Sequence, residues 1–255
     1  MAQSRIAAQM YTLRDFTKDP ADIAAAMKKV RQIGYEAVQL SALGPIDTVE
    51  LKRILDGEGL EVCATHISFQ RMKDEPESVI EEHKLLGCKY AAVGGMPAEY
   101  RNEEGYSRFA REASEVGKRL AEGGLVFGYH NHSFELERFG ARTGLEILYS
   151  ESDPRYVTAE IDTYWIQHGG GDPAAWIERV AGRIPLLHLK DMAIDRDMNQ
   201  LMAEVGEGNL NWPAILKASE QAGVLWYIVE QDTCRRDPFE SLAISLRNLN
   251  EMGLQ

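Results

Sequence analysis

Short apolar segments alternate with longer amphipathic segments along the chain, and glycine marks several of the junctions between them. Three such junctions are Ile33-Gly34-Tyr35, Leu86-Gly87-Cys88 and Ala222-Gly223-Val224. Glycine is common just after the last turn of a helix, because it adopts the left-handed backbone conformation without strain. Strands that alternate with helices indicate βαβ units and a parallel sheet. The repeated helix–glycine–strand pattern therefore predicts a parallel α/β fold.

The pattern predicts strands at residues 5–10, 37–40, 61–66, 90–93, 125–130, 157–162, 184–188 and 226–230. Helices are predicted between them, at residues 20–33, 48–58, 76–86, 103–121, 173–181, 211–222 and 238–252. The length of 255 residues is close to the ~250 typical of a TIM barrel, although a doubly wound open sheet fits the same length. Because the strands follow one another without a Pro/Ser-rich linker or charge tract, we predict one (β/α)8 barrel domain over residues 1–255.

The charge balance and the cysteines restrict the classes of partner. With 40 acidic and 28 basic residues the net charge is −12, which disfavours nucleic-acid binding because that needs a basic surface. No apolar run approaches the ~18 residues of a membrane span. The three cysteines, Cys63, Cys88 and Cys234, form no CxxC pair and fit reduced thiols. Since the first residues also lack a signal-peptide pattern, we expect a cytoplasmic protein without nucleic-acid or membrane partners.

Four ligand-type residues close successive apolar runs: His130, Asp162, His188 and Glu230. The active site of a (β/α)8 barrel lies at the carboxyl ends of the strands, so these side chains are expected to meet there. Two imidazoles and two carboxylates form a mixed set that suits Mn, Zn, Fe or Co. Singly, Asp162 could cap a helix and His188 could be a hydrogen-bonded core residue, whereas a buried Glu230 needs a partner. Their common placement predicts one divalent metal site.

The segment Tyr129-His-Asn-His132 offers two histidines that face the same side of a strand, because they are two residues apart. His130 is the preferred metal ligand, since it lies within the predicted strand. His132 is then free to bind the metal more distantly or to donate to substrate, and the alternative is that both histidines bond to loop backbone. Lys190 would lie near the metal and neutralise a developing oxyanion, or else be a solvated loop lysine.

Further candidates for substrate contacts lie on other predicted strand ends and loops. His66 closes the third predicted strand, and Gln39 lies in the second. Trp165 is expected to line an apolar wall of the pocket, with core packing as the alternative. Arg236 is a loop candidate, with a solvated surface charge as the alternative.

The connection at residues 190–212 is longer than the ~2–6 residues usual between a strand and a helix. A lid that contacts substrate and a disordered segment are the two interpretations. Gly206-Glu-Gly208 within it is a weak candidate for phosphate binding, and its glutamate would repel phosphate. A substrate without a phosphate group is therefore favoured.

With these motifs the chain resembles the xylose isomerase-like TIM barrel superfamily, which includes sugar phosphate isomerase/epimerase-like proteins, ketose 3-epimerases and inosose dehydratase. The similarity rests on the segments Gln9-Met-Tyr-Thr-Leu-Arg14, Tyr129-His-Asn-His132, Glu160-Ile-Asp-Thr-Tyr-Trp165, His188-Leu-Lys-Asp191 and Asp237-Pro-Phe-Glu-Ser241. The resemblance implies one divalent metal ion (Mn, Zn, Co or Fe, with Mg also allowed) on a Glu/Asp/His/Glu set. The last three ligands match Asp162, His188 and Glu230, whereas the first, commonly Glu, is His130 here.

The resemblance also implies an isomerase or epimerase that acts on a small ketose or keto-sugar through an enediolate, and it allows a homo-oligomer. Glu230 would be the base, Lys190 would stabilise the enediolate, and His132 or Lys190 would be the second proton carrier. Ketose 3-epimerases use two glutamates, of which only Glu230 remains here. A metal-dependent dehydratase or lyase of a keto-inositol or 3-keto-sugar is therefore the first alternative, and a non-catalytic sugar-binding barrel is the second.

Overall fold

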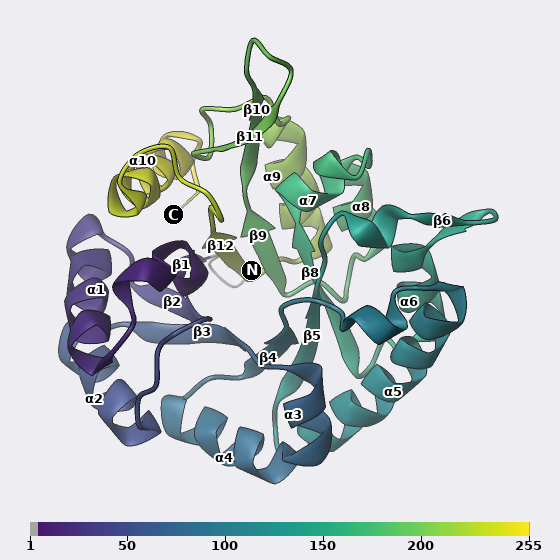
Figure 1. Cartoon of the computed structure of the whole chain (residues 1–255), viewed down its shortest axis with the longest axis horizontal. Coiled ribbons are helices and arrows are strands. Elements are labelled where there is room, and N and C mark those ends of the chain that lie inside the picture. The colour runs from purple at the N-terminus through teal and green to yellow at the C-terminus, as the bar shows by residue number, and fades with distance from the viewer. Residues whose placement is uncertain (1–4, 255) are drawn as a thin grey trace.

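The computed structural model describes residues 5–254, in which eight parallel strands close into a barrel surrounded by helices (Figure 1). Residues 1–4 and 255 of the predicted domain lie outside this range. Around the barrel the strand order is β1-β12-β9-β8-β5-β4-β3-β2, and β1 pairs with both β2 and β12. The barrel strands are β1 (Arg5–Gln9), β2 (Ala37–Leu40), β3 (Glu61–His66), β4 (Tyr90–Val93), β5 (Val126–His130), β8 (Val157–Asp162), β9 (Leu186–Leu189) and β12 (Trp226–Val229). The predicted (β/α)8 barrel is confirmed.

The predicted helices are also confirmed, with ends shifted by no more than two residues. The helices are α1 (Pro20–Ile33), α2 (Thr48–Glu58), α3 (Phe69–Asp74), α4 (Pro76–Leu86), α5 (Glu103–Glu122), α6 (Gly144–Glu151), α7 (Thr163–His168), α8 (Pro173–Arg179), α9 (Trp212–Ala222) and α10 (Pro238–Glu251). The short helices α3, α6 and α7 are additions to the prediction. For α6 the sequence does hold a signal, because Thr143 and Glu146 form a capping box at its start.

Positions that face the barrel interior change from apolar to polar toward the carboxyl ends of the strands. Residues two apart share a face of a strand. Leu186 precedes His188 in this way, and Ile228 precedes Glu230. Leu186 and Ile228 pack in a small apolar cluster with residues from the other strands, whereas His188 and Glu230 are buried polar residues. The polar site therefore lies next to a packed apolar layer inside the barrel, at the end where (β/α)8 barrels bind ligands.

The long connection after β9 is an ordered antiparallel hairpin of β10 (Asp191–Ile194) and β11 (Gln200–Ala203). It projects from the barrel at the top of Figure 1, and Met198 near its tip is 85% exposed. The interpretation of this segment as disordered is therefore wrong, and a role as a lid stays a prediction. A second small hairpin joins β6 (Arg138–Phe139) to β7 (Arg142–Thr143).

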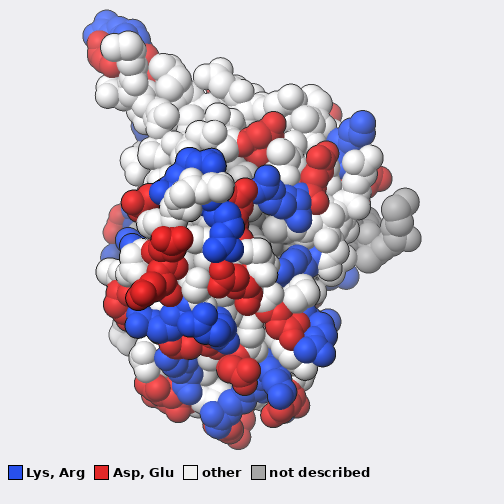
Figure 2. Space-filling view, turned by 90° about the vertical axis from the view of Figure 1, so that its right-hand side faces the viewer, with Lys and Arg blue, Asp and Glu red and all other residues white. Residues whose placement is uncertain are grey.

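Charged side chains of both signs are interspersed over the face shown in Figure 2. This face is the right-hand side of the barrel in Figure 1, which carries α5 and α6. The acidic excess of the chain is therefore not gathered into one field on this side. Within residues 5–254, no helix is long and apolar enough to cross a membrane.

Candidate active site

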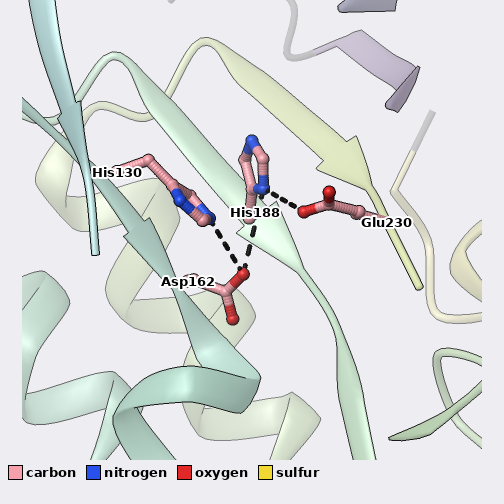
Figure 3. Close-up of side chains that lie close together, drawn as sticks. All are labelled: His130, Asp162, His188 and Glu230. Atoms are coloured by element: carbon pink, nitrogen blue, oxygen red, sulfur yellow. Dashed lines mark hydrogen bonds and ion pairs between the residues drawn. The ribbon is translucent and has the colours of Figure 1, made fainter. Parts of the chain in front are cut away.

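The four predicted metal ligands converge at the carboxyl ends of β5, β8, β9 and β12 (Figure 3). His130 Nε2 lies 3.1 Å from Asp162 Oδ2. His188 Nδ1 lies 2.8 Å from Glu230 Oε2 and 3.9 Å from Asp162 Oδ2. All four residues are buried, and one ligand atom from each lies within 4.8 Å of the others. Barrel closure thus brings together residues that are up to 100 positions apart in the chain (230 − 130 = 100).

The hydrogen bonds of the two histidines leave the correct nitrogens for a metal ion. His130 Nδ1 lies 3.2 Å from the carbonyl oxygen of Gly94, so the tautomer with the proton on Nδ1 would donate to Gly94 and leave the Nε2 lone pair for an ion. His188 Nε2 faces two acceptors, Gln39 Oε1 at 2.6 Å and Glu160 Oε1 at 3.1 Å, so this nitrogen carries a proton. Metal-binding histidines commonly donate their other N–H in this way. The donor set and its outer contacts therefore fit a divalent ion.

The charges of the site also suit metal binding. Burial lowers the pKa of His130, and the positive His188 lowers it further, so His130 is neutral. Burial also acts to lower the pKa of His188, but Glu160 and Glu230 outweigh it and raise the pKa to about 10. A ligand nitrogen must be deprotonated, so metal binding would release the proton from His188 Nδ1. Burial acts to raise the pKa of Asp162 and of Glu230, but the positive charge of Lys190 holds both below their usual range.

Lys190 is buried against three carboxylates. Its Nζ lies 2.7 Å from Glu230 Oε2, 3.1 Å from Asp162 Oδ2 and 2.9 Å from Asp232 Oδ1. Burial acts to lower the pKa of Lys190, but the three carboxylates raise it overall, so the side chain stays cationic. The alternative of a solvated loop lysine is wrong.

Asp232 is a functional candidate that the sequence analysis missed. It lines the cavity beside Lys190, and burial and the neighbouring charge of Glu230 raise its pKa to about 6. Asp232 lies two residues after Glu230, which is the same spacing that drew attention to His130 and His132. Applying this spacing to every strand end would have found it.

A cavity of about 460 Å³ is lined by two of the four predicted metal ligands, His130 and Glu230. The predicted site residues His66, His132 and Trp165 line it together with Tyr11 and Ser41, and their roles stay predictions.

Gly94 and Gly95, which follow β4, leave room for these histidines. A Cβ atom on Gly94 would lie 2.8 Å from His66 Nδ1, and one on Gly95 would lie 3.3 Å from His132 Cε1. Sequence reasoning missed the glycine pair, because its role depends on contacts with other strands.

Two polar atoms next to this cavity have no hydrogen-bond partner among the residues described. They are His132 Nδ1 and Trp165 Nε1, whose rings lie 5.3 Å apart. Burial, His130 and Lys190 together lower the pKa of His132 to about 3, so its ring is neutral. A buried polar atom without a partner costs about 1–3 kcal/mol. A substrate hydroxyl that reached these atoms would remove that cost.

The other predicted contact residues lie away from the cavity. Gln39 is inside the barrel below the quartet, where it contacts His188. Arg236 is partly exposed and pairs with Glu204 at 3.1 Å.

The glycine-rich loop at residues 206–208 is not a phosphate cradle. Its Gly206 and Gly208 N–H groups donate to Asp191 at 2.9 and 3.1 Å. The backbone groups that a phosphate would need are thus already bound, so the weak phosphate-site prediction is wrong.

The structure and sequence match known proteins over almost the whole chain. The chain is 25% identical to an inosose dehydratase of Lacticaseibacillus casei, over 84% of each protein. It is 24% identical to the rhizopine catabolism protein MocC of Rhizobium meliloti, over 89% of this chain and 80% of that one. A crystal structure of a sugar phosphate isomerase/epimerase from Parabacteroides distasonis ATCC 8503 is similar with a TM-score of 0.81 at 24% identity, and the match covers 98% of this chain and 94% of that one. The family model for the xylose isomerase-like TIM barrel matches residues 27–252, so the chain belongs to this family.

Proposed function

We propose that this chain is a divalent-metal-dependent isomerase or epimerase that acts on a small ketose or keto-sugar. The observation that carries the proposal is the buried quartet of His130, Asp162, His188 and Glu230 at the floor of a cavity. Similarity to a sugar phosphate isomerase/epimerase and to inosose dehydratase supports chemistry on sugars or polyols.

The quartet would hold one ion through two imidazole nitrogens and two carboxylates. This mixed set suits Mn, Zn, Co or Fe better than Mg, which prefers oxygen ligands. When bound, the ion would polarise the substrate carbonyl and acidify the neighbouring C–H bond.

The protein side chains would carry the proton transfers. Glu230 would remove the acidified proton. Its carboxylate contacts both His188 and Lys190 through the same oxygen, Oε2. Lys190 lies beside this carboxylate and would stabilise the negative oxygen of the enediolate, because its positive charge is fixed and desolvated. His132 is the proposed second proton carrier. Since its ring is neutral, it would give up its N–H proton only to a strongly basic oxygen such as that of an enediolate.

The charges around the cavity favour an unphosphorylated substrate. Lys190 is the only cationic lysine or arginine among the described residues that line the cavity, and three carboxylates already bind it. Glu230 and Asp232 add negative charge to the same wall. A phosphate group would therefore lose hydration without gaining a free cation, whereas sugar hydroxyls would meet His132 Nδ1 and Trp165 Nε1.

A dehydratase or lyase is the second candidate function. Epimerisation by two carboxylates needs one on each face of the substrate, but β5 supplies His130 where a second glutamate would be required. The same enediolate could instead expel a hydroxyl group from the next carbon as water, and Asp232 lies beside Lys190 as a possible acid for that group. Similarity to inosose dehydratase supports this alternative. A non-catalytic sugar-binding barrel is the third candidate.

The first test is elemental analysis of protein purified without chelator, beside a His188→Ala/Glu230→Ala double variant. We expect about one Mn, Zn, Co or Fe ion per chain, lost in the variant. The loaded protein is then incubated in deuterated water with ketoses, keto-inositols and 3-keto-sugars. Deuterium uptake with product otherwise unchanged in composition supports an isomerase, and loss of water supports a dehydratase. Failure to bind metal after reconstitution contradicts both, and metal binding without exchange favours the binding protein.

A further inference from the structure

We propose that Glu160 is a positioning residue that fixes which nitrogen of His188 faces the metal and that orients His66 in the cavity wall. This inference rests on the proposed metal site, but it assigns a role to a residue outside the ligand set. Glu160 lies on β8, two residues before Asp162, and its side chain points into the barrel.

The surroundings of Glu160 are unusual for a carboxylate. It is fully buried, and the ion pairs that it makes with the described residues are with His66 and His188. Burying a carboxylate is unfavourable unless it is paired and hydrogen-bonded. The cost of burying Glu160 must therefore be offset by its hydrogen bonds and ion pairs. The contacts of its two oxygens indicate what the residue does in the site.

Each oxygen of Glu160 accepts hydrogen bonds from a different part of the site. Oε1 lies 2.7 Å from Gln39 Nε2 and 3.1 Å from His188 Nε2. Oε2 lies 2.9 Å from His66 Nε2. Gln39 in turn accepts from Gln9 Nε2 at 2.7 Å.

Gln9 sets the order of donors and acceptors in this network. Gln9 donates to Gln39 Oε1, and Gln39 donates its own amide N–H to Glu160 Oε1. His188 Nε2 thus faces only acceptors, namely these two oxygens, and must carry a proton. A metal ion can therefore displace a proton only from Nδ1, which lies 2.8 Å from Glu230 Oε2, and would bind the lone pair left on that nitrogen.

The two histidines of the quartet should therefore bind the ion through opposite nitrogens. His130 would use Nε2, because its Nδ1 donates to the Gly94 carbonyl, and His188 would use Nδ1, because Glu160 holds its Nε2. Glu160 also links the quartet to the cavity, because His66 binds its second oxygen and stacks at 5.5 Å on the His188 ring. Loss of such an outer contact typically weakens metal binding about 10–100-fold.

The test compares Co²⁺ binding by the full-length parent protein, Glu160→Gln and the matched control Glu135→Gln. Glu135 is also fully buried and hydrogen-bonded, but its carboxylate accepts from the Tyr129 hydroxyl and from the backbone N–H of His132 instead of a quartet residue. Titrations are followed by calorimetry and by the visible absorption of Co²⁺, which reports coordination geometry. We expect the Kd of Glu160→Gln to rise about 10–100-fold with a changed spectrum, and that of Glu135→Gln to stay near the parent value.

A second measurement needs no variant. Long-range ¹H–¹⁵N spectra of the Zn²⁺-loaded parent protein, labelled on histidine, should show His188 protonated on Nε2 and His130 protonated on Nδ1. Zn²⁺ on Nε2 of His188, or parent-like Co²⁺ affinity in a folded Glu160→Gln protein, would overturn the inference and leave the proposed function standing. Failure of the parent protein to bind either metal would overturn both.

Discussion

The polar residues inside the barrel form two levels that differ in how completely their hydrogen bonds are satisfied. At the lower level, the side chains of Gln9, Gln39 and Glu160 bond to one another and to His188. The upper level is formed by the side chains that line the cavity, among them Lys190 and Glu230, and here His132 Nδ1 and Trp165 Nε1 lack partners among residues 5–254. The lower level is therefore complete without a ligand, whereas the upper level has hydrogen-bonding capacity left for one.

The comparison separates residues that hold the site from residues that act in it. Buried polar groups are normally satisfied, so we infer that this unsatisfied pair beside the cavity contacts water or a bound substrate. Changes at the upper level should alter catalysis or substrate affinity, and changes at the lower level should act through the metal. The variants of Glu230, Lys190 and Trp165 below test the upper level, and the His83 variant tests the hydrogen-bond criterion outside the site.

The largest effect is expected for Glu230→Gln. Removal of the proposed base should slow turnover about 10²–10⁴-fold, the usual range for general acid–base catalysis. Solvent deuterium exchange into a substrate identified by the screen measures the loss, while circular dichroism and metal content monitor the fold and the ion. A folded, metal-loaded variant with near-parent exchange would remove Glu230 from the proposed mechanism.

Lys190→Met should give the next largest effect. Loss of a preorganised cation beside a developing oxyanion typically slows turnover about 10²–10³-fold. The variant also leaves Asp162, Glu230 and Asp232 without their shared partner, which should destabilise the metal-free protein by about 3–5 kcal/mol. Since a divalent ion would replace part of the lost positive charge, denaturant unfolding should show a smaller loss with metal. An equal loss with and without metal would show that Lys190 and the ion do not share these carboxylates.

The sequence predicted the quartet and the upper level better than the lower level. His130, Asp162, His188 and Glu230 could be found because strand ends meet at one rim of a barrel, whatever the detailed packing. Glu160 was visible only as part of a motif, because its role depends on Gln39 and His66, from strands that come next to it only when the barrel closes. The alternation of strands and helices likewise predicts the fold. The need for glycine at positions 94 and 95 could not be predicted, because it depends on the side chains of His66 and His132 from other strands.

Trp165→Phe should have a smaller effect than either charge change. It keeps an aromatic ring at the cavity wall but removes the unpartnered Nε1–H, so a hydroxyl that it binds would lose one hydrogen bond. Such a bond contributes about 0.5–1.5 kcal/mol, and KM should rise up to about tenfold with kcat little changed. The control is Trp176→Phe, since Trp176 is a buried residue of α8 that does not line the cavity. A fall in kcat without a change in KM would place Trp165 in the chemistry rather than in substrate binding.

The smallest effect concerns His83, a histidine with both ring nitrogens satisfied, outside the barrel interior. His83 lies on α4, where its Nδ1 donates to the Val79 carbonyl at 2.7 Å. Its Nε2 lies 2.7 Å from Thr65 Oγ1 and accepts a hydrogen bond from that hydroxyl group. Burial lowers the pKa of His83 in the folded protein, whereas in the unfolded chain it titrates near 6.5. The unfolded state thus binds more protons as the pH falls below about 6.5, and His83 contributes stability at neutral pH that is lost toward acid. Denaturant unfolding of the parent protein and His83→Gln, compared at pH 7.5 and pH 5.5, should show the parent losing more stability than the variant, with metal affinity equal in the two. A pH response that is the same in both would mean that the folded protein tolerates a charged His83, and the hydrogen-bond criterion used to separate the two levels of the site would then fail for this histidine.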